Sequence, residues 1–193
     1  MPWGTVAGSG WATGLNLYAT VLLLGLAGRL GWADTPTEIQ QTWVLALMAV
    51  LYVVEFFVDK VPWADSLWDS VHTVIRPIGG GLLGALFAHE AGDPEVLAAL
   101  VGGGFSLTAH GAKASTRAMA NTSPEPVSNI TLSFAEDGVV AGMVALALAF
   151  PVIAGVVAVV FAVASVAVTW VLFKAVRSMW RRVRARRAAR APG

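Results

Sequence analysis

Apolar residues fill six stretches of the chain, separated by short polar or proline-containing segments. A helix that crosses a lipid bilayer needs about 20 mostly apolar residues, and the six stretches approach or exceed this length. They cover residues 5–31, 42–59, 74–89, 95–120, 131–149 and 152–178. The pattern predicts an all-α fold, a polytopic transmembrane bundle of about six spans. Six spans also divide into two halves of three, which is an arrangement found in transporters with inverted repeats.

The polar segment before the third span has the pattern of an amphipathic helix at about residues 62–76. Its polar side chains fall within about 60° of one another at 100° per residue: Asp65, Asp69, His72 and Arg76. Tryptophan, leucine and valine fill the opposite face, so we expect an interfacial helix on the cytoplasmic side, with one face toward water or protein. This face also contains residue types that can bind a metal ion, namely Asp65, Asp69 and His72. Ordinary i,i+3 and i,i+4 pairs give the same spacing and are the favoured interpretation.

The composition agrees with a membrane location and excludes several kinds of site. Of the 193 residues, 56% are hydrophobic and 13% are charged, whereas soluble domains carry about 25% charged residues. Cysteine is absent, which rules out disulfides, thiolate nucleophiles and cysteine-based metal sites. The chain contains no phosphate-binding loop, dinucleotide fingerprint, GxSxG elbow or HExxH motif. We therefore predict an integral membrane protein without a cofactor.

The charges divide the chain into a transmembrane domain, residues 1–173, and a basic tail, residues 174–193. The tail holds eight of the 13 Lys and Arg residues and no acid. Basic residues directly after an apolar helix indicate a cytoplasmic position and contact with anionic lipid headgroups, and we favour this over binding of nucleic acid. Counting back through six spans places the N-terminus in the cytoplasm as well.

Two predicted spans carry polar stripes that lipid would not tolerate without partners. In the fourth span the stripe has helical spacing of three and four residues and consists of Gly103, Ser106, His110, Lys113 and Arg117. A cationic group near the bilayer centre costs at least a few kcal/mol, so such a group must face a partner or water. In the first span Asn16 shares a face with three hydroxyl residues, and its amide needs partners that lipid cannot supply.

Acidic residues in the second and fifth spans are candidate partners for these cations. Glu55 and Asp59 lie one turn apart at the end of the second span, and Glu136 and Asp137 lie in the first turns of the fifth. Such residues are either ordinary helix-end residues or carboxylates that face Lys113 across a central cavity. In the second case the predicted pathway for an ion or solute comprises Asn16, Glu55, Asp59, His110, Lys113, Arg117, Glu136 and Asp137.

Three segments make the chain similar to a known family. They read GLNLYATVLLLGLAGRLGW, EFFVDKVPWADSLWDSVHTVIRP and HGAKASTRAMANTSPEPVSNITLSFAEDG. Over roughly residues 8–160 the chain resembles a bacterial membrane family known as domain of unknown function 4126. The resemblance implies a small multi-span protein of the bacterial inner membrane and implies no substrate or activity. Its motifs contain the same polar positions that the physical pattern selects.

Three functional classes fit these observations. The leading hypothesis is a small transporter or channel for an ion or small polar solute, with proton coupling as an option and a homo-oligomer as the expected assembly. The second is an intramembrane enzyme or scramblase acting on lipid headgroups, in which Asp69, His72 and Arg76 meet a phosphate. The third is a non-catalytic membrane scaffold. A charged cavity across the membrane would favour the transporter or channel. A shallow pocket at the membrane surface would favour the enzyme or scramblase.

Overall fold

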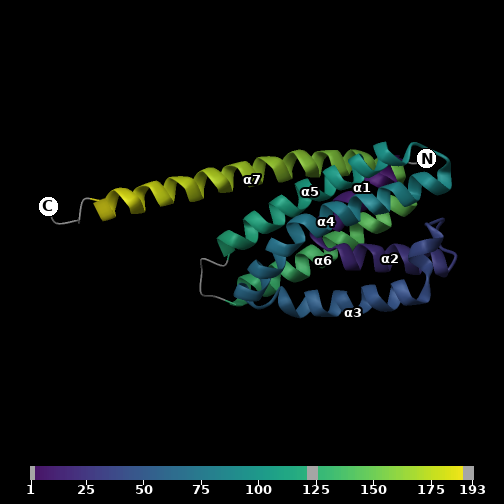
Figure 1. Ribbon diagram of the computed structural model, residues 1–193, viewed down its shortest axis with the longest axis horizontal. Coiled ribbons are helices and arrows are strands. Elements are labelled where there is room, and N and C mark those ends of the chain that lie inside the picture. The colour runs from purple at the N-terminus through teal and green to yellow at the C-terminus, as the bar shows by residue number, and fades with distance from the viewer. Residues whose placement is uncertain (1–2, 121–125, 189–193) are drawn as a thin grey trace.

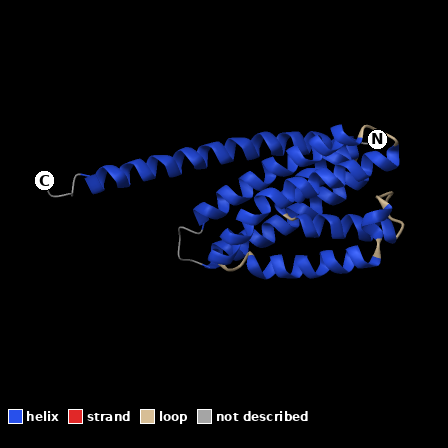
Figure 2. Ribbon diagram, viewed as in Figure 1, coloured by secondary structure: helices blue, strands red, loops and turns tan. Residues whose placement is uncertain are grey.

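The computed structural model describes residues 3–120 and 126–188, and these residues form helices joined by short connections (Figures 1 and 2). The prediction of an all-α fold is confirmed. The elements are α1 (Trp3–Leu15), α2 (Leu17–Arg29), the short 3-10 helix η1 (Thr37–Gln40), α3 (Thr42–Val58), α4 (Pro62–Ala91), α5 (Glu95–Ala120), α6 (Pro126–Ala149) and α7 (Pro151–Ala188).

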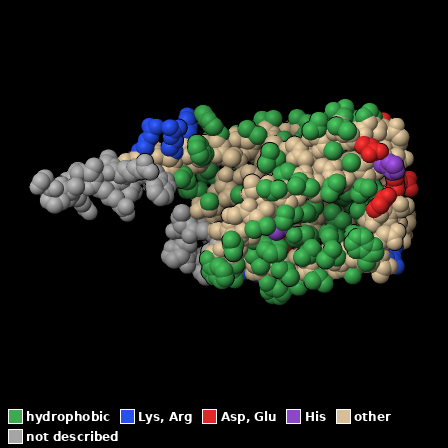
Figure 3. Space-filling view, in the orientation of Figure 1, with side chains coloured by type: hydrophobic (Ala, Val, Ile, Leu, Met, Phe, Trp, Pro, Cys, Tyr) green, Lys and Arg blue, Asp and Glu red, His purple; other side chains and the backbone are tan. Residues whose placement is uncertain are grey.

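The surface of the bundle has the character of a membrane protein. Within the described residues, three helical segments are long and apolar enough to cross a bilayer: Trp63–Ala91, Ile130–Ala149 and Pro151–Ser178. Helices α2 and α3 are apolar but shorter. Large hydrophobic side chains cover much of the outside (Figure 3), which water would disfavour and lipid favours. Three crossing helices thus have support, and the predicted total of six spans remains a prediction.

The first predicted span, residues 5–31, is broken into two helices at Asn16. The backbone of Asn16 is extended, with φ −148° and ψ 100°, and its side-chain oxygen accepts a hydrogen bond from the Ala19 amide, which caps α2. Asparagine is among the preferred residues at such a cap because its side chain satisfies a free amide at the helix start. The apolar run of residues 5–31 therefore contains two helices of 13 residues each.

Helices α1 and α2 form a hairpin that enters the bundle and returns to the same end. Helix α1 runs parallel to α5, since Gly10 lies against Gly102 and Gly14 against Ser106. After α2, the Thr37 amide binds Glu90 at the end of α4, directly before α5 begins. As a consequence, α1 begins at one end of the bundle and α7 ends at the other (Figure 1). We expected both termini on the same side of the membrane, because we took residues 5–31 to be one helix that crosses the membrane. The arrangement of the helices differs from that expectation.

Helix α4 joins the predicted interfacial helix and the third predicted span into one element. It continues from Pro62 to Ala91 through Pro77. Its polar face, from Asp65 to Arg76, is buried in protein, whereas Leu67, Val71 and other apolar side chains of the opposite face are exposed. The helix is thus amphipathic with its polar side inward, and the structure shows no separate helix for residues 62–76. The expected repeat of two halves also stays a prediction, because α5 is unbroken where α1–α2 is interrupted.

The close approach of α1 and α5 depends on glycine. A Cβ atom added to Gly10 would lie 2.7 Å from both the Cα and the carbonyl oxygen of Gly102, a backbone contact that no rotamer change relieves. A Cβ on Gly104 would meet no atom within 4 Å. We expect Gly10→Ala to lower the stability by about 1–3 kcal/mol, as overpacking does. Gly104→Ala should cause no loss, because alanine favours the helix. Thermal unfolding of both variants in detergent tests this, and equal melting temperatures would contradict it.

Candidate functional site: a buried charge cluster

The polar residues that the sequence singles out meet at one place inside the bundle, although they come from four helices and the α1–α2 break. We call this set the charge cluster, and it comprises Asn16, Glu55, Asp59, Asp65, Asp69, His72, Arg76, His110, Lys113, Arg117, Glu136 and Asp137. Most of these side chains are almost completely buried. Buried charges require partners, and three cations provide most of them.

Arg76 links α4 to three other helices, α1, α3 and α5. Its guanidinium pairs with the Oε1 atom of Glu55 and, at 3.3 Å, with Oδ1 of Asp69. It also donates to the Gly14 carbonyl at 3.3 Å and to Nδ1 of His110 at 2.8 Å. Arg76 and Glu55 are both 0% exposed, so this pair is held entirely by protein.

Lys113 from α5 is the centre of the charge cluster. Its Nζ atom lies 2.9 Å from Oδ2 of Asp59 and 3.4 Å from both Oε1 of Glu55 and Oε2 of Glu136. It also donates to the Leu15 carbonyl at 3.1 Å. One ammonium group therefore joins carboxylates from α3 and α6 to the end of α1.

Arg117, one turn further along α5, binds the same two helices near the end of the bundle. It makes a two-point contact with Glu136, with Nε to Oε1 at 3.2 Å and NH2 to Oε2 at 2.6 Å. It donates to the Asp59 carbonyl at 2.8 Å, and its NH1 atom lies 3.7 Å from Oδ1 of Asp65. Two-point contacts between arginine and carboxylate are among the stronger polar interactions in proteins.

The helix break places main-chain groups directly in the charge cluster. The last carbonyls of α1 have no partner within the helix, and those of Gly14 and Leu15 accept hydrogen bonds from Arg76 and Lys113. The C-terminal end of a helix carries partial negative charge, which these cations stabilise. Asn16 caps α2 with its oxygen while its Nδ2 donates to Asp137 at 3.2 Å. The broken helix is therefore part of the site.

His110 is neutral in this arrangement. An arginine N–H can only donate, so Nδ1 of His110 accepts from Arg76 and carries no proton. The proton lies on Nε2, which donates to the Thr73 hydroxyl at 3.1 Å, and that hydroxyl donates to the Asp69 carbonyl. His110 therefore contributes no counter-charge to the charge cluster in this arrangement.

Both tyrosines of the chain belong to the site, although the pattern of polar residues in the sequence does not point to them. The Tyr18 hydroxyl lies 2.8 Å from Nε2 of His72, whose Nδ1 donates to the Trp68 carbonyl. The Tyr52 hydroxyl donates to Asp137 at 3.4 Å. The chain contains only two tyrosines, and both lie inside apolar runs. A buried tyrosine hydroxyl usually has a hydrogen-bond partner. A tyrosine within an apolar run is therefore a sequence signal that identifies candidate members of a buried polar site.

The carboxyl groups of the charge cluster outnumber its cations by six to three. The six are Glu55, Asp59, Asp65, Asp69, Glu136 and Asp137, and the three are Arg76, Lys113 and Arg117. Three buried carboxylate oxygens also have no hydrogen-bond partner in the described part of the chain: Oε2 of Glu55, Oδ1 of Asp59 and Oδ2 of Asp69. Burial strongly disfavours uncompensated charge. The site therefore has capacity for additional positive charge, in the form of protons or a cation.

Adjacent residues on α6 have different surroundings. Glu136 pairs with both Lys113 and Arg117. Among the described residues, Asp137 has the neutral donors Asn16 and Tyr52 alone, and no described Lys or Arg lies within 4.0 Å of its carboxyl group. Protonation of Glu136 would therefore weaken two ion pairs, whereas protonation of Asp137 would weaken none with a described Lys or Arg.

The described residues contain no set of metal ligands at this site. In residues 3–120 and 126–188, no three carboxylate or imidazole side chains come together in a way that could hold one. The alternative that Asp65, Asp69 and His72 are metal ligands gains no support. Asp65 and Asp69 instead pair with Arg117 and Arg76.

Comparison with known families gives one result. The model of the family described as domain of unknown function (DUF4126) matches residues 4–171. The chain belongs to the DUF4126 family. The match extends from α1 into α7, so the charge cluster lies within the matched residues, whereas the basic tail, residues 174–193, lies beyond them. No curated protein and no solved structure matches the chain.

Proposed function

We propose that this protein is a small transporter or channel of the bacterial inner membrane that moves an ion or small polar solute with proton coupling. The observation that carries the proposal is the α1–α2 hairpin, whose broken end brings the Gly14 and Leu15 carbonyls to a buried group of charges. In many transporters, interrupted helices supply main-chain groups to the substrate or ion at mid-membrane. Ionisable residues inside a membrane usually mark such a pathway.

The proposed orientation follows from the charges at the two ends. Figure 3 shows acidic side chains at the end where α4 passes into α5, where Glu90, Asp93 and Glu95 lie. Lys174, Arg177 and Arg181 lie on α7 toward the other end. Basic residues favour the cytoplasm, so the end of α7 is cytoplasmic and the hairpin opens to the outside. In this proposal α3 to α7 each cross the membrane and the N-terminus is outside.

In this proposal, a solute or proton that moves from the cytoplasmic end to Asp137 passes the aromatic pair Phe56 and Phe134. Tyr52, Phe56 and Lys60 follow one another at intervals of four residues on α3, and so share a face. The ring of Phe56 meets that of Phe134 from α6 at 5.7 Å between centroids, and Nζ of Lys60 lies 3.0 Å from the Phe56 centroid. Phe134 is three residues from Asp137. We propose that this pair is a gate between the cytoplasm and Asp137.

The alternative of an enzyme or scramblase acting on lipid headgroups has less support. In that hypothesis Asp69, His72 and Arg76 contact a phosphate at the membrane surface. All three side chains are buried, and Arg76 already has four acceptors in the protein. A headgroup would have to displace these contacts. The homo-oligomer expected from the small size of the chain stays a prediction.

The test of the proposed function is uptake into sealed proteoliposomes. Purified protein is reconstituted, and a panel of labelled monovalent ions, amines and small organic acids is offered with and without a pH gradient. We expect at least one solute to enter faster than into protein-free liposomes and its rate to depend on the gradient. Uptake that never exceeds the protein-free control, from protein shown to be folded and inserted, would contradict the proposal.

A further inference from the structure

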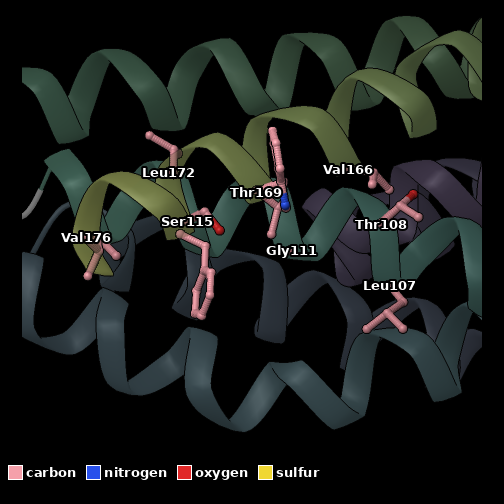
Figure 4. A pocket seen from close by; sticks show the side chains of 11 residues that line it. Leu107, Thr108, Gly111, Ser115, Val166, Thr169, Leu172 and Val176 are labelled. Carbon is pink, nitrogen blue, oxygen red and sulfur yellow. The ribbon is translucent and has the colours of Figure 1, made fainter. Parts of the chain in front are cut away.

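An apolar groove runs along the outside of the bundle between α5 and α7 (Figure 4). Its volume is about 630 Å³, within the usual range for ligand sites. Side chains from both helices face it, including Leu107, Ser115, Val166 and Phe173. The groove is separate from the charge cluster, since none of the cluster residues lines it.

The groove lies in one half of the membrane-spanning part of α7. It extends from Val166 to Val176 on this helix, and the apolar span of α7 ends at Ser178. Eleven helical residues correspond to about 16 Å, roughly half of the ~30 Å hydrocarbon core. The groove therefore has the length of one leaflet and ends where the membrane meets water.

Two basic side chains, Lys174 and Arg177, lie at the end of the groove nearest to Ser178, and no described acid pairs with them. Nζ of Lys174 lies 3.9 Å from the ring centroid of Trp170, which lines the groove. Arg177 follows Phe173, another lining residue, by one helical turn and is exposed. No acidic residue follows Asp137 in the sequence, and no described carboxylate pairs with Lys174 or Arg177. The rim is therefore complementary to an anion.

We propose that the groove binds an anionic phospholipid, with an acyl chain between α5 and α7 and the phosphate group near Lys174 and Arg177. The apolar lining favours a hydrocarbon chain, and basic residues at the cytoplasmic interface attract anionic headgroups. A second copy of the chain is a poorer occupant, because side-by-side packing would bring two identical basic tails together. The site does not depend on the proposed transport function.

The test is native mass spectrometry of the detergent-solubilised full chain, titrated with phosphatidylglycerol or with phosphatidylcholine of the same acyl chains. We expect phosphatidylglycerol to bind at least tenfold more tightly. The double variant Lys174→Ala/Arg177→Ala should lose about tenfold or more of this affinity, since each cation near the headgroups contributes measurably. Equal binding of the two lipids, or no change in the double variant, would overturn the proposal.

A second variant tests the groove itself. A Cβ on Gly111 would lie 3.4 Å from Oγ1 of Thr169, so Gly111→Leu directs a side chain into the groove while both cations remain. We expect it to reduce phosphatidylglycerol binding, and Gly104→Leu, which points into open space, to leave it unchanged. A dimer that forms without lipid and is lost in Gly111→Leu would show that a second copy occupies the groove, and would overturn the proposal.

Discussion

Replacement of Lys113 by alanine is expected to lower the stability of the protein by about 3–5 kcal/mol, because removing one partner of a buried ion pair leaves the other charge uncompensated. Lys113 contacts Glu55, Asp59 and Glu136 within 3.4 Å and is only 3% exposed. For a chain of this size the loss corresponds to a fall in melting temperature on the order of 10 °C. Thermal unfolding in detergent measures it.

The pH dependence of this loss of stability shows whether lost charge or lost packing causes it. In Lys113→Ala the remaining carboxylates can be neutralised by protons, so the deficit should be large near neutral pH and smaller at mildly acidic pH. Lys174→Ala is the matched control, because Lys174 is exposed and its removal should change the melting temperature little in detergent. A deficit that is the same at both pH values would mean that lost packing, and not lost charge, causes the effect.

The second large effect is expected at Asp137. Asparagine has the same shape as a protonated aspartic acid and can keep the contacts with Asn16 and Tyr52. Asp137→Asn should therefore fold normally but lose an exchangeable proton. Glu136→Gln should be clearly destabilised, since it weakens the two-point contact with Arg117.

Infrared spectroscopy distinguishes these outcomes, because a protonated carboxyl group has a carbonyl band separate from that of a carboxylate. We expect the band to be present in the wild-type protein and weakened in Asp137→Asn. Asp34→Asn, at an exposed position between α2 and η1, should leave it unchanged. An undiminished band in Asp137→Asn would show that the proton is held elsewhere, and equal stability of Asp137→Asn and Glu136→Gln would contradict the division of roles.

The sequence predicts the members of the charge cluster well because lipid tolerates few unpaired charges. His110, Lys113 and Arg117 share one face of α5 by spacing alone, and of these Lys113 and Arg117 pair with the acids of α3 and α6. The different surroundings of Glu136 and Asp137 were not predictable. Neighbours on a helix point about 100° apart, and which of them faces the cations depends on how α6 is rotated in the bundle.

Two structural features were missed for physical reasons. The dense charges of residues 62–76 are typical of a helix at the membrane surface, but in this protein Asp65, Asp69 and Arg76 face a polar interior while apolar side chains face outward. The break at Asn16 was hidden by the continuous apolar run on both sides. Asparagine is a common helix cap, and two helices of 13 residues are too short to cross singly, so a hairpin was an available alternative.

We propose that the charge cluster couples movement of a solute to movement of protons through Asp137. The most direct measurement uses sealed proteoliposomes containing a trapped pH dye, an imposed solute gradient, and either wild-type protein or Asp137→Asn at equal insertion. We expect a solute-dependent pH change with the wild type and none with Asp137→Asn. A pH change of the same size with both proteins, or none with the wild type for any solute that it transports, would contradict it.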